Sequence, residues 1–388
     1  MTGIKVRTAL QQPEWSDPSQ VERVGEVLAS RPALVRAEDV LSLRSLLAEV
    51  ALGKYLVLQG GDCAEDPEES TYMHVSTKAA MLDVLAGAFK MITHKPVLRV
   101  GRIGGQYAKP RSSPTEEVDG VTLPAFRGHL VNGPEPTPVS RRPDPLRILT
   151  AYMAAGDVME HLGWRGSFSR PLSEPPVWTS HEALLLDYEL PMLRYDGGEG
   201  GKPILGSTHW PWIGERTRQV DGAHVALLAE VANPVACKVG PKMTESELLA
   251  LCERLDPRRE PGRLTLIARM GAEFAAERLP RLVEVVRAAE HPVVWLCDPM
   301  HGNTIRTPDG HKTRVVETLK QEVREFVWAV ESEGGVAGGL HLETTPDDVT
   351  ECAEDRSELA QVGERYTTLC DPRLTIWQAV SVISAWSE

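Results

Sequence analysis

Short apolar runs alternate with segments of helical periodicity along most of this 388-residue chain. The runs are rich in Val, Leu, Ile and Ala, which is typical of strands that are buried on both faces. Nearly all of them are separated by a helical segment, and this arrangement predicts parallel strands joined by helical crossovers. Eight such runs occur, at residues 55–61, 97–100, 177–179, 208–213, 235–239, 264–268, 293–297 and 336–342.

The alternation favours an α/β fold, a (β/α)8 TIM barrel with additional amino-terminal helices. A doubly wound open sheet is the structural alternative, but it would gather its chemistry at one switch point instead of distributing it over all strands. We expect one domain over residues 1–388. Within it, residues 1–50 form a helical extension, the barrel strands lie between 55 and 343, and residues 344–388 form carboxyl-terminal helices.

Helical spacing predicts where the crossovers lie. One stretch breaks the pattern, because residues 113–145 are rich in proline, glycine and charge and are too long for an ordinary strand-to-helix loop. That stretch is therefore functional or disordered. The expected helices span 73–91, 146–161, 183–193, 219–231, 245–255, 277–289 and 315–331, followed by one near 347–353 and a terminal helix.

Composition narrows the class of protein. The formal charge of −13 argues against sequence-independent binding of nucleic acid, which needs a basic surface. The chain has no run of eighteen apolar residues and no basic-then-apolar start, so we expect a cytoplasmic protein without a membrane segment. The six cysteines are scattered without a CxxC pair, and most of them are expected to be buried free thiols.

Polar residues follow almost every apolar run, at the edge where a barrel carries its active site. Taken singly, each has a structural explanation, such as a packed cysteine, a core histidine or a cation paired with an acidic neighbour. Their coincidence at one edge favours a functional site instead. In chain order they are Cys63, Arg102, Glu182, Glu215 with Arg216, Lys238, Arg269, His301 and Glu343.

The stretch 96–112 concentrates cations on a stiff turn. Gly104 and Gly105 would let backbone N–H groups approach a ligand closely, and the proline in KPRS fixes φ between two cations. A solvated basic loop is the alternative interpretation. Cations, N–H groups and a hydroxyl on such a turn suit a multiply anionic small molecule. The turn presents Lys109, Pro110, Arg111 and Ser112.

Two chemical groups separate among these residues and predict a metal-dependent enzyme acting on phosphorylated anions. The first is a set of soft and hard ligands suited to Mn, Co, Zn or Fe, namely Cys63, His301, Glu343 and the later Asp371. The second is a cationic basin able to hold more than one phosphate or carboxylate, formed by Arg102, Lys109, Arg111, Arg216, Lys238 and Arg269.

The chain resembles the class II 3-deoxy-D-arabino-heptulosonate 7-phosphate (DAHP) synthases. The resemblance is carried by nine motifs that follow one another between about residues 57 and 375: QGGDCAE, GRIGGQYAKPRS, SHEALLLDYE, WIGERTRQVDGAH, NPVACKVGP, RMG, CDPMHGNT, GGLHLE and CDPRL. It implies a (β/α)8 barrel, in agreement with the strand count. It also implies the condensation of phosphoenolpyruvate with D-erythrose 4-phosphate and water to DAHP and phosphate, the first step of the shikimate pathway.

The resemblance also assigns roles to residues. It implies one divalent ion, Mn²⁺ or Co²⁺ with Zn²⁺ and Fe²⁺ as alternatives, on Cys63, His301, Glu343 and Asp371. Phosphoenolpyruvate would contact Arg102, Lys109, Glu215 through its backbone, Arg216, Lys238 and Arg269. Erythrose 4-phosphate would contact Lys109, Arg111 and Ser112. Lys109 would protonate the new alkoxide, and Glu182 would handle the attacking water.

Some features depart from the family pattern. His129 stands where the family usually has an aspartate, and the segments associated with aromatic amino-acid feedback look shorter. We therefore expect weak feedback and a setting in secondary metabolism. Two alternatives stay open: a synthase that uses a nitrogen analogue of erythrose 4-phosphate, and a catalytically silent paralogue that binds a partner. We also expect a homo-oligomer, either dimer or tetramer, with a chorismate-pathway enzyme as a candidate partner.

Overall fold

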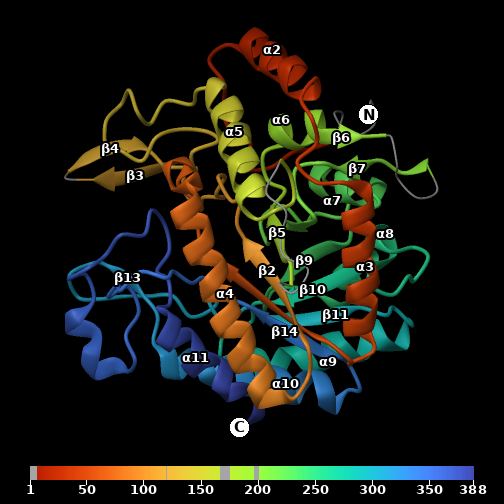
Figure 1. The fold of residues 1–388 in the computed structure, drawn as a ribbon. Coiled ribbons are helices and arrows are strands. Elements are labelled where there is room, and N and C mark those ends of the chain that lie inside the picture. The colour runs from red at the N-terminus through yellow and green to blue at the C-terminus, as the bar shows by residue number, and fades with distance from the viewer. Residues whose placement is uncertain (1–6, 119, 167–174, 196–200) are drawn as a thin grey trace.

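Eight parallel strands close into a barrel in the computed structural model, which describes residues 7–118, 120–166, 175–195 and 201–388 (Figure 1). Their order around the barrel is β1-β14-β11-β10-β9-β8-β5-β2, so the predicted (β/α)8 fold is confirmed. The strands are β1 Leu56–Gly61, β2 Val97–Arg102, β5 Val177–Glu182, β8 Trp210–Ile213, β9 Val235–Val239, β10 Leu264–Ala268, β11 Val294–Cys297 and β14 Ala337–His341.

Within the described residues, a helix follows each barrel strand and two helices precede the barrel. The two amino-terminal helices are α2 Pro18–Ala29, which Asp17 caps by accepting from the N–H groups of Ser19 and Gln20, and α3 Ala37–Ala51. The others are α4 Tyr72–Thr93, α5 Leu146–His161, α6 Leu186–Glu189, α7 Ala223–Glu230, α8 Glu245–Leu255, α9 Ala275–Ala288, α10 Val316–Ser332 and α11 Ile376–Ser384.

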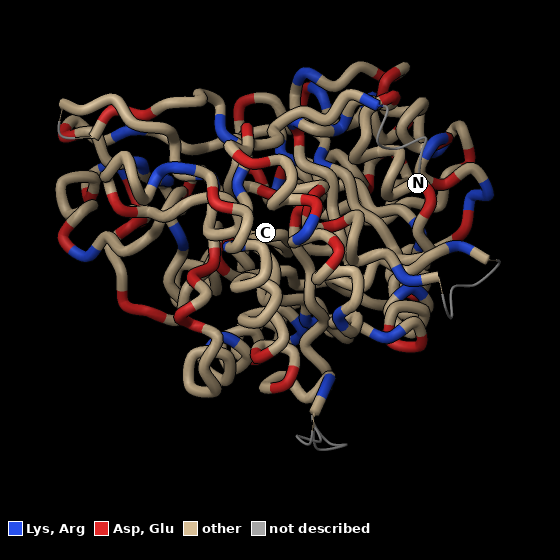
Figure 2. Tube along the Cα trace, turned by 90° about the horizontal axis from the view of Figure 1, so that it is seen from above, with Lys and Arg blue, Asp and Glu red and all other residues tan. Residues whose placement is uncertain are grey.

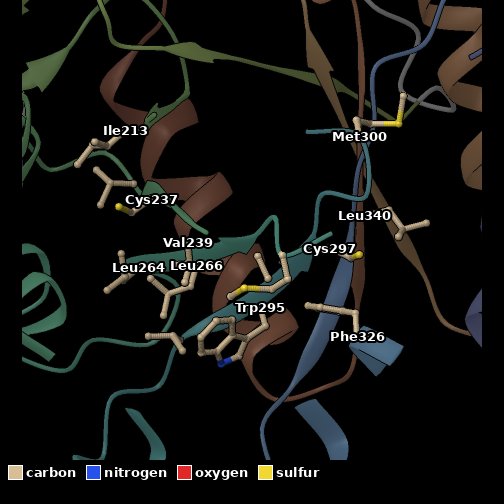
Figure 3. Packing of buried hydrophobic residues seen from close by; sticks show 14 of the residues in the cluster. Ile213, Cys237, Val239, Leu264, Leu266, Trp295, Cys297, Met300, Phe326 and Leu340 are labelled. Atoms are coloured by element: carbon tan, nitrogen blue, oxygen red, sulfur yellow. The ribbon is translucent and has the colours of Figure 1, made fainter. Parts of the chain in front are cut away.

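Apolar side chains fill the layer between strands and helices. Figure 3 shows residues from successive strands next to one another, with Trp295 of β11 and Phe326 of α10 both within this layer. Helix α3 covers the amino-terminal ends of the strands, since Val50 lies against Gly338 and Ala48 lies against Gly262. One end of the barrel is therefore closed, and the opposite, carboxyl edge carries the long loops.

These loops contain short two-stranded sheets. β3 and β4 form a hairpin inside the irregular stretch 113–145, which is thus partly structured. The short strands are β3 Thr115–Val118, β4 Val121–Pro124, β6 Leu193–Arg194, β7 Ile204–Leu205, β12 Ile305–Arg306 and β13 Lys312–Thr313.

Two predicted helices are wrong. Residues 183–193 form only the single turn α6 and a 3-10 turn at 190–192, because the segment contains Pro191 and then pairs as β6. Residues 347–353 are not helical, because their backbone bonds elsewhere: the N–H of Thr350 donates to Arg365 and that of Ala353 to Arg314. A 3-10 helix forms instead at Arg356–Gln361.

Charged residues of both signs are interspersed along the described parts of the trace (Figure 2). The excess of acidic residues is therefore not confined to one segment, and any basin for anions has to be built locally. Within the described residues, no helix combines the length and the apolar character needed to cross a membrane.

Candidate metal and anion site

A cavity of about 1520 Å³ opens at the carboxyl edge of the barrel. It brings together residues that are up to 269 positions apart in the sequence, as expected for strand ends of one barrel. Of the residues predicted from the sequence, its lining includes Arg102, Lys109, Arg111, Ser112, Glu182, Glu215, Arg216, Lys238, Arg269, His301 and Asp371. Cys63 and Glu343 are fully buried next to this cavity, beside Asp371.

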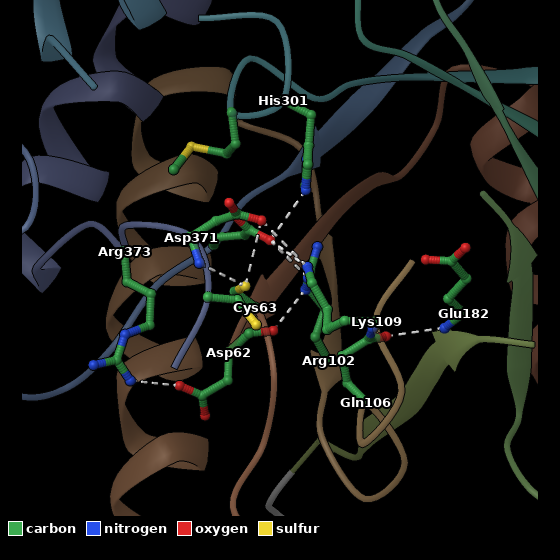
Figure 4. Close-up of polar contacts among 12 residues, drawn as sticks. Asp62, Cys63, Arg102, Gln106, Lys109, Glu182, His301, Asp371 and Arg373 are labelled. Carbon is green, nitrogen blue, oxygen red and sulfur yellow. Dashed lines mark hydrogen bonds and ion pairs between the residues drawn. The ribbon is translucent and has the colours of Figure 1, made fainter. Parts of the chain in front are cut away.

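The predicted metal ligands converge. Ligand atoms of Cys63, Glu343 and Asp371 all lie within 4.8 Å of one another. His301 joins them, with its Nε2 3.2 Å from Oε1 of Glu343. Figure 4 shows Cys63, Asp371 and His301 pointing toward a common region from separate loops. The thiol, imidazole and carboxylates are a donor set that fits a divalent transition metal.

Burial and neighbouring charges shift the pKa values of the acidic groups in this cluster. Burial acts to raise the pKa of Glu343, but the positive charges of His301, Arg314 and Arg102 outweigh it and hold the pKa well below its usual range. The pKa of Asp371 is likewise lowered against burial, chiefly by Lys109. Burial raises the pKa of the Cys63 thiol well above its usual value. The carboxylates are thus ionised, and a metal ion would compete for them with the surrounding Lys and Arg side chains.

An ion pair between two buried residues fixes the distance between the Cys63 and Asp371 loops. Arg373 contacts Oδ1 of Asp62 with Nη1 at 2.7 Å, and Asp62 directly precedes Cys63 (Figure 4). Arg373 also contacts Glu351 at 2.8 Å. The N–H of Asp371 donates to the Cys63 sulfur at 3.1 Å. Two ligands that are 308 positions apart in the chain are therefore held in contact.

Asp298, which sequence reasoning missed, links the metal ligands to the cations. Its carboxylate accepts from Lys238 and lies 2.8 Å from Nδ1 of His301. The side chain of Asp298 is fully buried, and its contacts with His301 and Lys238 hold its pKa well below its usual range against burial. Contact through Nδ1 leaves Nε2 of His301 facing Glu343, the orientation that a metal ligand needs. Asp298 directly follows β11 within the CDPMHGNT motif, so its strand-end position was a signal that could have found it.

The cations of the basin are held by different partners. Burial lowers the pKa of Lys238 to about 8, although Asp298 acts in the opposite direction. Arg102 is buried and donates to Glu343 at 2.9 Å. Arg269 donates to the carbonyl of His301. Arg216 is exposed at the cavity wall. The basin therefore combines rigid cations at its floor with an accessible one at its rim.

Glu182 and Glu215 differ in how free their side chains are. Oε1 of Glu182 has no hydrogen-bond partner among the described residues, and burial raises the pKa of this carboxyl. Its N–H donates to Gln106 at 2.9 Å, which fixes the backbone (Figure 4). The carboxylate of Glu215 instead accepts from Arg218 at 3.0 Å. Glu182 is thus a buried acidic group at the cavity wall, and one of its carboxylate oxygens has no hydrogen-bond partner among the described residues.

The expectation that N–H groups of the double glycine face a ligand is wrong. The carboxylate of Glu65 accepts from the N–H groups of Gly104, Gly105 and Gln106 at 2.8, 2.8 and 2.6 Å. The glycines are needed for packing, because a Cβ on Gly105 would lie 2.1 Å from Nδ1 of His181. His129 also contacts Glu65, since its Nδ1 lies 3.1 Å from the carbonyl oxygen of Glu65.

Gly105→Ala should therefore destabilise the protein by about 1–3 kcal/mol through overpacking against His181. Gly87→Ala is the matched control, because a Cβ there meets nothing within 4 Å and Gly87 lies within α4. We expect the control to be stabilised by about 0.5–1 kcal/mol. Urea unfolding measures both, and a Gly105→Ala protein as stable as the wild type would show that the turn can move.

Further cations come from a loop that sequence reasoning left out. Arg314 is fully buried and contacts Oε2 of Glu343 at 2.8 Å, and Lys312 contacts Asp371 at 2.7 Å. Both line the cavity, together with Arg306. The signal that could have found them is the basic sequence HKTR, which follows the His301 motif and precedes α10.

The fold is a closed (β/α)8 barrel, and its carboxyl edge carries buried thiol and carboxylate donors next to a cation-lined cavity. This combination defines a barrel enzyme for anionic substrates. The model of the Class-II DAHP synthetase family matches residues 2–163 and 154–385. The chain therefore belongs to the class-II DAHP synthetase family.

Three curated relatives are similar over nearly their whole length. A probable phospho-2-dehydro-3-deoxyheptonate aldolase from Pseudomonas fluorescens is 59% identical, with 97% of this chain and 94% of the relative covered. The phospho-2-dehydro-3-deoxyheptonate aldolase of Streptomyces coelicolor is 40% identical, covering 96% and 93%. Phospho-2-dehydro-3-deoxyheptonate aldolase AroG of Mycolicibacterium smegmatis is 38% identical, covering 97% and 91%.

Proposed function

We propose that this protein is a 3-deoxy-7-phosphoheptulonate synthase that condenses phosphoenolpyruvate and D-erythrose 4-phosphate with water, giving DAHP and phosphate. The observation that carries the proposal is the convergence of Cys63, His301, Glu343 and Asp371 beside a cavity lined by cations. Membership of the family and the names of the three relatives point to the same reaction.

The four converging residues would hold one divalent ion, with Mn²⁺ or Co²⁺ as our first choice. Such an ion, when bound, acts as a Lewis acid toward the aldehyde oxygen of the sugar phosphate. Arg102, Lys109, Arg216, Lys238 and Arg269, with the backbone of Glu215, would bind phosphoenolpyruvate. Lys109, Arg111 and Ser112 would bind erythrose 4-phosphate.

The chain's own residues account for the remaining steps. The cations that bind phosphoenolpyruvate orient its C3 toward the aldehyde carbon. The electron pair of the C2=C3 double bond forms the new C–C bond, which leaves C2 electron-deficient. Lys109 donates a proton from Nζ to the aldehyde oxygen. Water adds at C2 and gives a proton to the carboxylate of Glu182, which lines the cavity. The bond between C2 and the phosphate oxygen then breaks while the new hydroxyl on C2 becomes the ketone C=O. The hydroxyl proton passes to the departing phosphate, which leaves with the electron pair of the broken bond and is stabilised by the arginines.

The experiment that tests this function follows phosphoenolpyruvate in purified protein with and without erythrose 4-phosphate, before and after chelation. We expect consumption only with the aldehyde, loss of activity on chelation, and recovery with Mn²⁺ or Co²⁺. Consumption that is unaffected by removing the metal would contradict the metal assignment. No consumption by metal-loaded protein would contradict the function.

The same assay addresses the alternatives. A nitrogen analogue of erythrose 4-phosphate that is turned over faster than erythrose 4-phosphate would favour the amino-DAHP type of synthase. A silent paralogue is disfavoured because the donors and the cations are all present.

We further propose weak aromatic feedback and a secondary-metabolic setting. In support, the alignments with the Streptomyces and Mycolicibacterium relatives span 421 and 428 positions, more than the 388 residues here. The oligomeric state, a partner enzyme and a cytoplasmic location stay predictions.

A further inference from the structure

The segment of residues 7–15 lies along the carboxyl edge of the barrel and contacts several of its loops. The N–H of Ala223 donates to the carbonyl of Thr8 at 3.0 Å. Gln12 accepts from the N–H of Leu186 at 3.0 Å, and Trp15 donates to Asp187 at 2.7 Å. These contacts hold the segment in place at points away from the KPRS turn.

Gln11 within this segment makes a separate contact to the turn that follows β2. Its side-chain Oε1 accepts from the backbone N–H of Arg111 at 2.8 Å, across 100 positions of sequence. Its φ of 62° is in the left-handed region, which a glutamine rarely adopts. The neighbouring contacts thus hold Gln11 in an unfavourable backbone conformation from which its amide reaches the turn.

A second bond completes a small network around the turn. Nη2 of Arg127 donates to the carbonyl of Gln11 at 2.6 Å, and the carbonyl of Arg127 accepts from the N–H of Lys109 at 2.8 Å. Gln11 and Arg127 therefore fix the backbone on both sides of Pro110. The pKa of Arg127 is lowered by burial and, to a smaller extent, by the charge of Arg111.

We propose that Gln11 is a positioning residue for the sugar-phosphate half of the cavity. By fixing the peptide of Arg111, it sets the direction in which Arg111 and Ser112, both in the cavity lining, meet the phosphate of the second substrate. The inference rests on the proposed function, because that function assigns this half of the cavity to erythrose 4-phosphate. Among the described residues, the side chain of Gln11 bonds to the peptide of Arg111. Lys109, which would contact both substrates, is linked to Gln11 only through Arg127 and the Gln11 backbone carbonyl, and a change of the Gln11 side chain keeps that carbonyl.

The test compares steady-state constants for both substrates in Gln11→Met, Gln11→Glu and Trp15→Phe. Methionine keeps the length of the side chain but removes the acceptor, whereas glutamate keeps an acceptor oxygen. Loss of one hydrogen bond should raise the KM for erythrose 4-phosphate about three- to tenfold. The KM for phosphoenolpyruvate and the affinity for Mn²⁺ should stay within about twofold. Gln11→Glu should restore the wild-type KM.

Trp15→Phe removes one bond of the same segment to a different loop, so it controls for general loosening. Equal changes in both KM values, or the same change in Trp15→Phe as in Gln11→Met, would overturn the inference. An unaltered KM for erythrose 4-phosphate in Gln11→Met would overturn it too. If the wild type consumes no phosphoenolpyruvate with erythrose 4-phosphate, the proposed function fails first, and this inference fails with it.

Discussion

Cys63→Ser should yield a folded protein that binds Mn²⁺ or Co²⁺ at least about 100-fold more weakly than the wild type and has no measurable turnover. The exchange of sulfur for oxygen changes the shape of the side chain little. It replaces a soft ligand that ionises on metal binding by a hydroxyl that does not. Substitution of a residue that only supports a metal ligand typically lowers metal affinity about 10- to 100-fold. Substitution of the ligand itself should therefore lower it at least as much. Calorimetric titration measures the affinity for the metal, and a thermal melt shows whether the variant is folded.

The control for this substitution is Cys370→Ser. Cys370 is the other sulfur at the site, since it precedes Asp371 and accepts from Arg111 at 3.8 Å. It is not among the residues whose ligand atoms cluster within 4.8 Å. We therefore expect Cys370→Ser to retain the metal. A protein that keeps its metal as Cys63→Ser and loses it as Cys370→Ser would reverse the assignment.

The barrel could be predicted because its strands are buried on both faces and therefore appear as uninterrupted apolar runs. Helices with long amphipathic faces, such as α9 and α10, were equally visible. The failures occur where tertiary contacts override local preference. The segment 183–193 has helical spacing, yet Gln12 and His181 bond to its first turn and its last residues pair in β6.

The site was predictable to the extent that a barrel places strand ends together. That rule found Cys63, Arg102 and Lys238 without knowledge of any distance. Asp298 directly follows β11 and so met the same rule, but the sequence analysis chose His301 from that motif because the role of Asp298 depends on its contact with Lys238. The rule could not find Arg314, whose importance comes from its contact with Glu343. It also misread the glycines of the turn after β2. Whether an N–H group faces a ligand or Glu65 depends on a carboxylate from another loop.

Lys238→Met should raise the KM for phosphoenolpyruvate by about 10- to 100-fold, the loss expected for one hydrogen bond to a charged group. Lys238 is buried at the cavity floor with Asp298 as its ion-pair partner, so a bound anion would find it already oriented. Metal affinity should change far less, because Asp298 keeps its 2.8 Å contact to His301. Steady-state kinetics and metal titration separate the two effects.

Lys242→Met is the matched control for this substitution. Lys242 lines the same cavity but is exposed, so its charge is screened by water and its removal should change the KM less than about threefold. The buried variant has a second expected cost, because Met leaves the carboxylate of Asp298 with one cationic partner fewer. We therefore expect a lower unfolding temperature for Lys238→Met. The kinetic measurements should be made well below that temperature. If a folded Lys238→Met protein retained the wild-type KM, the phosphoenolpyruvate half of the site would have to lie elsewhere in the cavity.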